Sequence, residues 1–269
     1  MKSQKRIEAA RDAFERGDLQ ASALAHQPNR ISQATAEERH GGASSQYLGD
    51  LVFGGLDGII TTFAVVSGVA GAQLASKVIL ILGLANLFAD GFSMATGSFL
   101  STRSEQEYYQ RERRREAWEV EHFPEGERAE LIELYLRRGY SKEDANTLVE
   151  IQSRDPKRWV DAMMIDELRM LPDERKPLLS GLATLVAFIA AGSIPLLVYL
   201  LGLFIPIPLK NSFPLSVVLS AVALFGLGAA KVLVTQRSAI RSGLEMLLIG
   251  GLAAGVAYLV GVLLKGIGG

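Results

Sequence analysis

The sequence contains no cysteine among its 269 residues. This absence excludes a disulfide framework and a zinc site built on thiolates, so any metal has to bind oxygen, nitrogen or thioether ligands. The first residues, MKSQKRIEAARDAFERG, lack the apolar core of a secretory signal, and we expect the N-terminus to stay in the cytosol. An excess of basic residues is also missing, since the net charge is −1, and we expect no nucleic-acid partner.

Charge is unevenly distributed along the chain. Charged residues make up 21% of the sequence, and most of them fall in residues 1–40 and 103–176. The remainder contains five apolar stretches, each long enough, at about 20 residues, to span a membrane. The expected spans are residues 48–72, 78–101, 178–203, 213–235 and 243–265.

We therefore predict an all-α protein whose fold is a five-span transmembrane helical bundle. A cytosolic helical metal-binding domain, called the insert below, lies between spans two and three. The expected division of the chain is a polar N-terminal arm at 1–46, spans one and two at 47–102, the insert at 103–176 and spans three to five at 177–269.

The basic residues predict how the chain is oriented in the membrane. An odd number of spans puts the two termini on opposite sides. The arm, the insert and the connection after span four carry most of the lysine and arginine, whereas the other side has only Lys77, Lys210 and Lys265. The positive-inside rule places the arm and the insert in the cytosol. We expect a multi-pass integral protein of a bacterial inner membrane.

Helix formers, capping residues and prolines predict four helices in the insert. Pro124 to Gly126 marks an expected break between the first two, and Pro156 lies in the first turn of the fourth. Because the insert is small for an independent domain, we expect it to extend span two. The expected helices are Arg103–Glu121, Glu127–Arg138, one that follows the capping signal Ser141–Asp144, and Asp155–Met170.

Ionisable and polar residues occur inside the first two predicted spans. Such groups are costly in lipid and are usually functional. At about 1.5 Å per residue, Asp57 and Met94 share one depth in the membrane. We predict an ion path lined by Asp57, Thr61, Asn86, Asp90 and Met94. In the alternative interpretation, the two aspartates cap helices or hydrogen-bond locally where glycine-rich helices pack.

Glycine is frequent in the same two spans. Small residues let helix backbones approach closely, both within one subunit and between subunits. We expect a homodimer through spans one and two. The glycines concerned are Gly54, Gly55, Gly58, Gly68 and Gly71 in span one and Gly91 and Gly97 in span two.

Carboxylate and thioether side chains recur at helical spacing in the insert. Two Glu-x-x-Glu pairs flank the expected break, and a Met-Met-x-x-Glu sequence lies in the fourth helix. Carboxylates suit hard divalent ions, whereas thioethers favour softer metals, so the mixture predicts iron, manganese, cobalt or zinc. For any single glutamate, a solvated surface or an ion pair with arginines 113–115 is the alternative. The predicted ligands are Glu116, Glu119, Glu127, Glu130, Met163, Met164 and Glu167.

These motifs resemble the vacuolar iron transporter family. The similarity covers about residues 45–266 and is carried by Gly49–Ala64, Ala89–Gly97, the two glutamate pairs and Met163–Glu167. The resemblance implies a five-span homodimer that exchanges protons for Fe²⁺, often also Mn²⁺, with Asp57 and Met94 on the path and the insert residues binding metal. We therefore expect proton-coupled export of Fe²⁺ from the cytosol, with Mn²⁺, Zn²⁺ or Co²⁺ as further ions. We expect neither enzymatic activity nor a prosthetic group.

Two other functions fit parts of the sequence. Glu119-x-x-His122 resembles half of a di-iron oxidation site, which uses two such motifs on paired helices, and the insert holds one. A membrane-embedded metal sensor or scaffold without transport would fit the insert alone. Such a protein would not need polar residues along the first two spans.

Overall fold

The structure is a computed structural model that describes residues 9–10, 12–25, 46–205, 207–230 and 238–265. Met1–Gln46 and Tyr47–Gly269 are two separate compact units. The first contains helix α2 (Leu19–Ala25). Everything below concerns the second unit.

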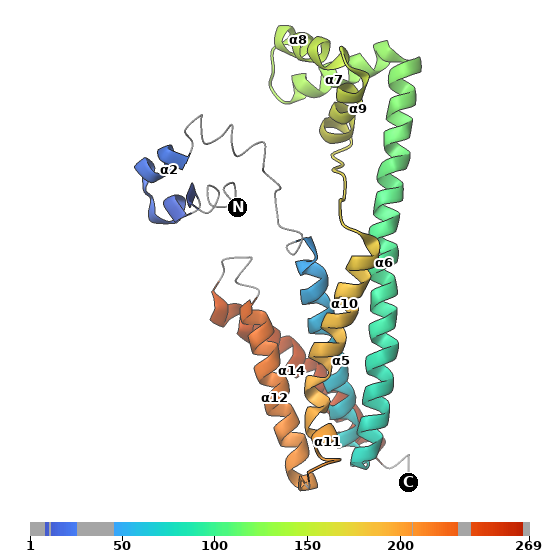
Figure 1. Cartoon of the computed structure of the whole chain (residues 1–269), viewed down its shortest axis with the longest axis vertical. Helices are drawn as coiled ribbons and strands as arrows, with labels where there is room; N and C mark the ends of the chain where they lie inside the picture. The colour runs from blue at the N-terminus through green and yellow to red at the C-terminus, as the bar shows by residue number, and fades with distance from the viewer. Residues whose placement is uncertain (1–8, 11, 26–45, 206, 231–237, 266–269) are drawn as a thin grey trace. The chain divides into compact units, whose positions relative to one another are not determined.

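Five helical segments of the second unit are long and apolar enough to cross a membrane. They are α5 (Leu48–Gly71), α6 (Ser76–His122), Pro177–Leu201, α12 (Leu209–Ala230) and α14 (Ala239–Leu264). Helices run through the whole colour range of Figure 1, and no strand occurs in the described ranges. The predicted all-α, five-span fold is confirmed.

Helix α6 joins the membrane part to the insert without a break. It has 47 residues, more than twice the roughly 20 that a membrane span needs. The expected boundary near residue 102 is therefore not a structural one. The first predicted helix of the insert is the continuation of span two. This agrees with the expectation, based on the small size of the insert, that the insert extends that span.

The third span is interrupted, which the sequence prediction missed. Helix α10 (Pro177–Gly192) is followed by a 3₁₀ turn, η2 (Ile194–Leu196), and by the short helix α11 (Leu197–Leu201). Pro195 lies in this turn and has no N–H to continue an α-helical hydrogen-bond ladder. Its carbonyl oxygen accepts a hydrogen bond from the Ser216 hydroxyl of α12 at 2.6 Å.

The fourth span also begins earlier than predicted. Helix α12 starts at Leu209, so Pro214 lies in the second turn of the helix rather than at the second residue of the span. Its last described residue is Ala230, and the predicted residues 231–235 lie outside the described ranges.

Helix α10 packs against both α5 and α6, beside which it lies in Figure 1. Backbone carbonyls of Thr184 and Phe188 approach Gly54 and Gly58 so closely that a Cβ atom at either glycine would clash with them. These glycines are thus needed for packing within the chain and no longer support a dimer by themselves. Gly97 has nothing within 4 Å of a built Cβ. The homodimer stays a prediction.

The insert has helices α7 (Pro124–Arg137), α8 (Lys142–Ser153) and α9 (Pro156–Ala162). The expected break at Pro124–Gly126 is wrong, because α7 begins at Pro124. Proline suits the first position of a helix, since its missing N–H would be unpaired there anyway. Only Phe123 separates α6 from α7.

The fourth expected helix is shorter than predicted and changes type. After α9 the chain forms one π-helical turn, η1 (Met163–Glu167), and continues without helix to α10. The predicted capping signal is confirmed, since the Ser141 hydroxyl oxygen accepts a hydrogen bond from the Asp144 N–H at 3.1 Å.

The insert has its own hydrophobic core. Leu131, Met163 and Met164 have no exposed surface, and Tyr135 and Trp159 pack with them. Burying a large apolar side chain fully contributes about 1.5–3 kcal/mol to stability. This core therefore stabilises the packing of α7, α9 and η1 against one another. It thereby fixes the helices that carry the predicted metal ligands.

Candidate metal centre

Five glutamates from three helices converge in the insert. Glu116 and Glu119 come from the end of α6, Glu127 and Glu130 from the start of α7, and Glu167 from η1. One oxygen from each of Glu116, Glu119 and Glu127 lies within 4.8 Å of the others, and the same holds for Glu127, Glu130 and Glu167. Glu127 belongs to both groups. We call these five residues the glutamate centre.

Local chain geometry explains this convergence. The single residue between α6 and α7, Phe123, donates its N–H to the Glu119 carbonyl at 2.7 Å and turns the chain sharply. The last turn of α6 therefore faces the first turn of α7. In η1 the Leu168 N–H reaches the Met163 carbonyl, five residues back, at 3.1 Å. Such π turns hold one extra residue and are frequent at functional sites. Here the turn carries Glu167.

Burial and mutual repulsion favour the protonated forms of these carboxyls. Glu116 is 1% exposed and Glu127 is 5% exposed. For Glu116, burial opposed by Arg115, together with neighbouring carboxylates, raises the pKa to about 7. Burial and nearby carboxylates, Glu116 first, raise the pKa of Glu127 to about 7 as well. The pKa of Glu167 is also raised, first by burial and then by Glu130. The glutamate centre thus exchanges protons near neutral pH.

Two carboxylate oxygens in the centre have no hydrogen-bond partner. They are the buried Oε2 atoms of Glu127 and Glu167. A buried acceptor without a partner is costly and calls for an explanation such as an ion. Glu130 is also the largest influence, after burial, that raises the pKa of Glu167, so these two carboxylates repel each other when both are ionised. A divalent cation would supply partners for all these oxygens and relieve the repulsion.

Arg115 is the cation that the structure places against the centre. Its guanidinium lies 2.6 Å from Glu116, 2.7 Å from Glu119 and 3.1 Å from Glu112. The alternative interpretation, an ion pair with one of arginines 113–115, is thus correct for Glu116 and Glu119. Glu127, Glu130 and Glu167 form no ion pair with a cationic side chain in the part of the chain that the structure describes, so the positive charge lies on one side of the centre.

Glu112 is a residue that the sequence prediction missed. It lies one turn before Glu116 and is 9% exposed. Hydrogen bonds from Arg111 and then from Arg115 lower its pKa. Glu112 therefore stays ionised and holds Arg115 in place. The spacing of residues 112, 116 and 119 could have revealed it, since all three share a helix face.

The predicted thioether ligands lie in the core of the insert. Met163 and Met164 have no exposed surface and pack among apolar side chains. Ordinary packing explains their burial, and metal binding by their sulfur atoms stays a prediction.

His122 belongs to neither group of carboxylates. Its ring stacks on Trp118 at 4.5 Å, and its Nδ1 atom lies 2.8 Å from the Trp118 carbonyl. The structure therefore gives the di-iron interpretation no histidine ligand from the insert. A second Glu-x-x-His sequence does occur in the arm, at Glu37–His40, but it lies outside the described residues.

The predicted path residues lie on α5 and α6, which contact each other. Asp57 and Asp90 are half-buried and close enough for their charges to interact. The Thr61 hydroxyl donates to the Asp57 carbonyl oxygen at 2.8 Å, so it bonds to the backbone of its own helix. Asn86 has a buried Nδ2 without a partner. Met94 packs against the core of the bundle. The structure brings the two aspartates together, and the path itself stays a prediction.

Comparison with known proteins gives the family. A sequence model of the VIT family matches residues 48–262. A vacuolar iron transporter from Toxoplasma gondii is 36% identical over 96% of this chain and 88% of its own length. A vacuolar iron transporter from Plasmodium berghei is 34% identical over 98% of both chains. Vacuolar iron transporter 1 from Arabidopsis thaliana is 34% identical over 78% of this chain and 82% of its own length. Because the match runs from the start of α5 almost to the end of α14 and includes the insert, the chain belongs to the VIT family and is a multi-pass membrane protein.

Proposed function

We propose that this protein transports Fe²⁺ out of the cytosol in exchange for protons. The observation that carries the proposal is the glutamate centre, in which two groups of three carboxylates have Glu127 in common. The same chain has a pair of aspartates inside helices that are long and apolar enough to cross a membrane. The names of the relatives, all vacuolar iron transporters, support iron as the ion. The relatives named above are eukaryotic, and the expected bacterial inner membrane stays a prediction.

The glutamate centre is proposed to collect the ion. A divalent cation that binds there replaces protons on Glu116 and Glu127 and gives the buried oxygens of Glu127 and Glu167 a partner. Carboxylate oxygens accept Fe²⁺ and also Mn²⁺, and we propose Mn²⁺ as a second ion, with Zn²⁺ and Co²⁺ also bound.

Asp57 is proposed to couple ion and proton movement. Its carboxylate binds either a proton or, with Met94, a metal ion, and each ligand weakens the binding of the other. Protons that enter from an acidic outer side therefore expel the metal there. A deprotonated Asp57 that faces the cytosol binds the next ion. The orientation follows from the basic residues of the arm and insert, and we propose that two copies form the working unit.

Uptake of Fe²⁺ into liposomes that contain the purified protein tests this proposal. Asp57→Asn keeps the size and a carbonyl ligand but cannot ionise, so we expect loss of transport driven by the pH gradient. Metal binding by the insert should be retained. Asp161→Asn, an exposed aspartate of the insert that pairs with Arg113, is the matched control and should transport normally.

Two results would contradict the proposal. An Asp57→Asn protein with undiminished dependence on the pH gradient would exclude Asp57 as the coupling residue and leave Asp90. A wild-type protein that binds metal but transports none would favour the sensor or scaffold.

A further inference from the structure

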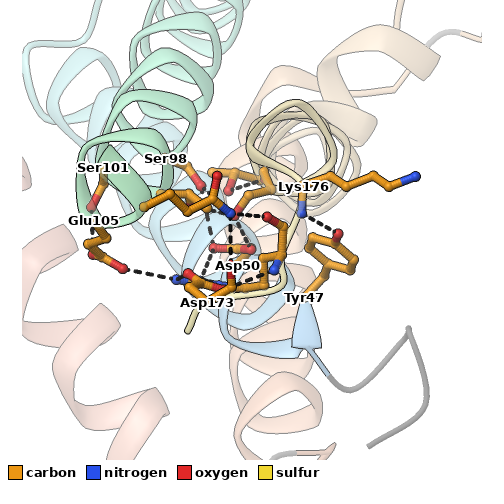
Figure 2. A network of polar contacts seen from close by, with 12 residues as sticks. Tyr47, Asp50, Ser98, Ser101, Glu105, Asp173 and Lys176 are labelled. Carbon is orange, nitrogen blue, oxygen red and sulfur yellow. Dashed lines mark hydrogen bonds and ion pairs between the residues drawn. The ribbon is translucent and has the colours of Figure 1, made fainter. Parts of the chain in front are cut away.

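A second polar network lies where α5, α6 and α10 meet the insert side of the bundle (Figure 2). The Ser180 hydroxyl of α10 donates to Asp50 of α5. From α6, the Ser98 hydroxyl donates to the Asp50 carboxylate at 3.4 Å, and the Thr102 hydroxyl donates to Ser180 at 3.3 Å. With Arg175, these residues form what we call the mouth network.

Arg175 supplies the positive charge of this network. One guanidinium nitrogen lies 4.0 Å from the Asp50 carboxylate, and another lies 2.7 Å from Asp173 and 3.3 Å from Glu105. The Gln106 amide donates to the backbone carbonyls of Asp173 and Arg175 at 3.0 and 2.5 Å. The backbone of this segment is thereby fixed beside α6.

The mouth network continues the predicted path. Asp50 lies seven residues, or two turns, before Asp57, on the same face of α5 and about 10 Å away along its axis. Ser98 and Thr102 lie one and two turns beyond Met94 on α6. Both polar rows that line the predicted path therefore end in this network, on the side from which the insert projects.

Arg175 is also close in sequence to the glutamate centre. Only residues 168–174 separate it from Glu167, and no helix occurs between η1 and α10. Because the backbone carbonyl of Arg175 is held by Gln106, only the Arg175 side chain has to move away from Asp50, and α10 stays packed. Its shorter contact with Asp173 would persist after the 4.0 Å contact with Asp50 is broken.

We propose that Asp50 is the carboxylate that an incoming divalent ion meets first on the path, and that Arg175 is a tethered cation that covers it until the ion arrives. The inference rests on the proposed transport function and adds two residues to it. A divalent ion carries twice the charge of the guanidinium and competes effectively for Asp50. Arg175 then remains paired with Asp173 and Glu105, so its release leaves no unpaired charge.

A labelling experiment tests the cover without any need for transport. The chain has no cysteine, so Thr102→Cys supplies the only thiol. Thr102 is 2% exposed, and maleimide should react with that thiol slowly. Adding Arg175→Gln should raise the rate about five- to tenfold, the effect of losing an ion pair worth about 1 kcal/mol. Mn²⁺ should raise the labelling rate of the Thr102→Cys protein by a similar factor. Adding Arg175→Lys, which keeps the positive charge, should leave the labelling slow. Equal rates in all these samples would overturn the inference.

Transport kinetics separate a covering cation from a merely structural ion pair. If Arg175 competes with the ion, Arg175→Gln lowers the KM for Fe²⁺ about five- to tenfold, whereas Asp50→Asn raises it. A structural pair would shift both variants in the same direction. Arg137→Gln, which removes an exposed ion pair with Glu133, is the control and should leave KM unchanged.

The outcomes distinguish this inference from the proposed function. If the wild-type protein transports Fe²⁺ and Arg175→Gln and Asp50→Asn shift the KM in the same direction, the proposed role of Arg175 is overturned and the transport function is not. If the wild-type protein transports no Fe²⁺, but Arg175→Gln and Mn²⁺ each raise the labelling rate, the transport function is overturned and the proposed role of Arg175 is supported. If Asp50→Asn fails to fold, Asp50→Glu, which keeps the charge, should retain a KM within about twofold of wild type.

Discussion

Metal binding by the glutamate centre should depend steeply on pH. Glu116 and Glu127 have pKa values of about 7, because they are buried among other carboxylates. Each is therefore about nine-tenths protonated at pH 6 and about one-tenth protonated at pH 8. A divalent ion needs both in the ionised form and must displace these protons at the lower pH.

The size of the effect follows from those two groups. Displacing one proton costs about 1.4 kcal/mol per pH unit below the pKa, so two groups lower the affinity about 100-fold between pH 8 and pH 6. Acidic pH thus favours release. Without metal, the same two groups make the folded protein less stable as pH rises, whereas metal affinity increases with pH. Their folded pKa lies above the usual 4.5, so the stability they contribute is fully present below pH 4.5 and is lost as pH rises through 7.

Titration calorimetry of the full-length protein in detergent with Mn²⁺ measures this prediction. Buffers of different ionisation enthalpy report the protons released, about two per ion at pH 6 and almost none at pH 8. Glu133→Gln, an exposed glutamate of α7, should show the same pH slope as wild type. An affinity that changes less than about threefold between the two pH values, or binding at pH 6 without proton release, would refute the reasoning.

Three further predictions follow from the insert and the topology. Arg115→Gln removes the cation that competes for the glutamate centre and should tighten Mn²⁺ binding several-fold in the same calorimetry; unchanged affinity contradicts this role. Leu131→Ala should destabilise the insert by about 2–5 kcal/mol, measured through the chain's two tryptophans, whereas Leu136→Ala on its surface should cost about 0.5 kcal/mol or less. Single cysteines at Ser141 and Lys210 should label from opposite sides of the membrane, and labelling of both from one side would show that the predicted topology is wrong.

Helical spacing explains why much of this arrangement could be predicted. Residues three or four apart share a helix face, so the pairs Glu116/Glu119 and Glu127/Glu130 had to present neighbouring carboxylates. Length and hydropathy likewise predict the membrane helices, because a span needs about 20 apolar residues. Glu167 is also predicted, from the Met-Met-x-x-Glu motif, and the structure places it beside Glu127 and Glu130.

Other features depend on contacts that spacing does not encode. Three consecutive arginines precede Glu116, and only the packed structure shows that Arg115 pairs with the centre while Arg113 reaches Asp161. Asp50 meets Ser180, which is 130 residues away, so no local pattern indicates the mouth network. The π turn that carries Glu167 spans one residue more per hydrogen bond than an α-helix does, and helical spacing in the sequence does not reveal that extra residue.

The unbroken helix α6 sets a distance between binding and transport. Glu116 lies 14 residues beyond Thr102 on this helix, which corresponds to about 21 Å at 1.5 Å per residue. No side chain spans that distance, so an ion cannot pass directly from the glutamate centre to the mouth network of its own chain. It has to diffuse through water. Under the proposed function the insert is therefore a separate binding station, and each ion crosses about 21 Å of water between it and the path.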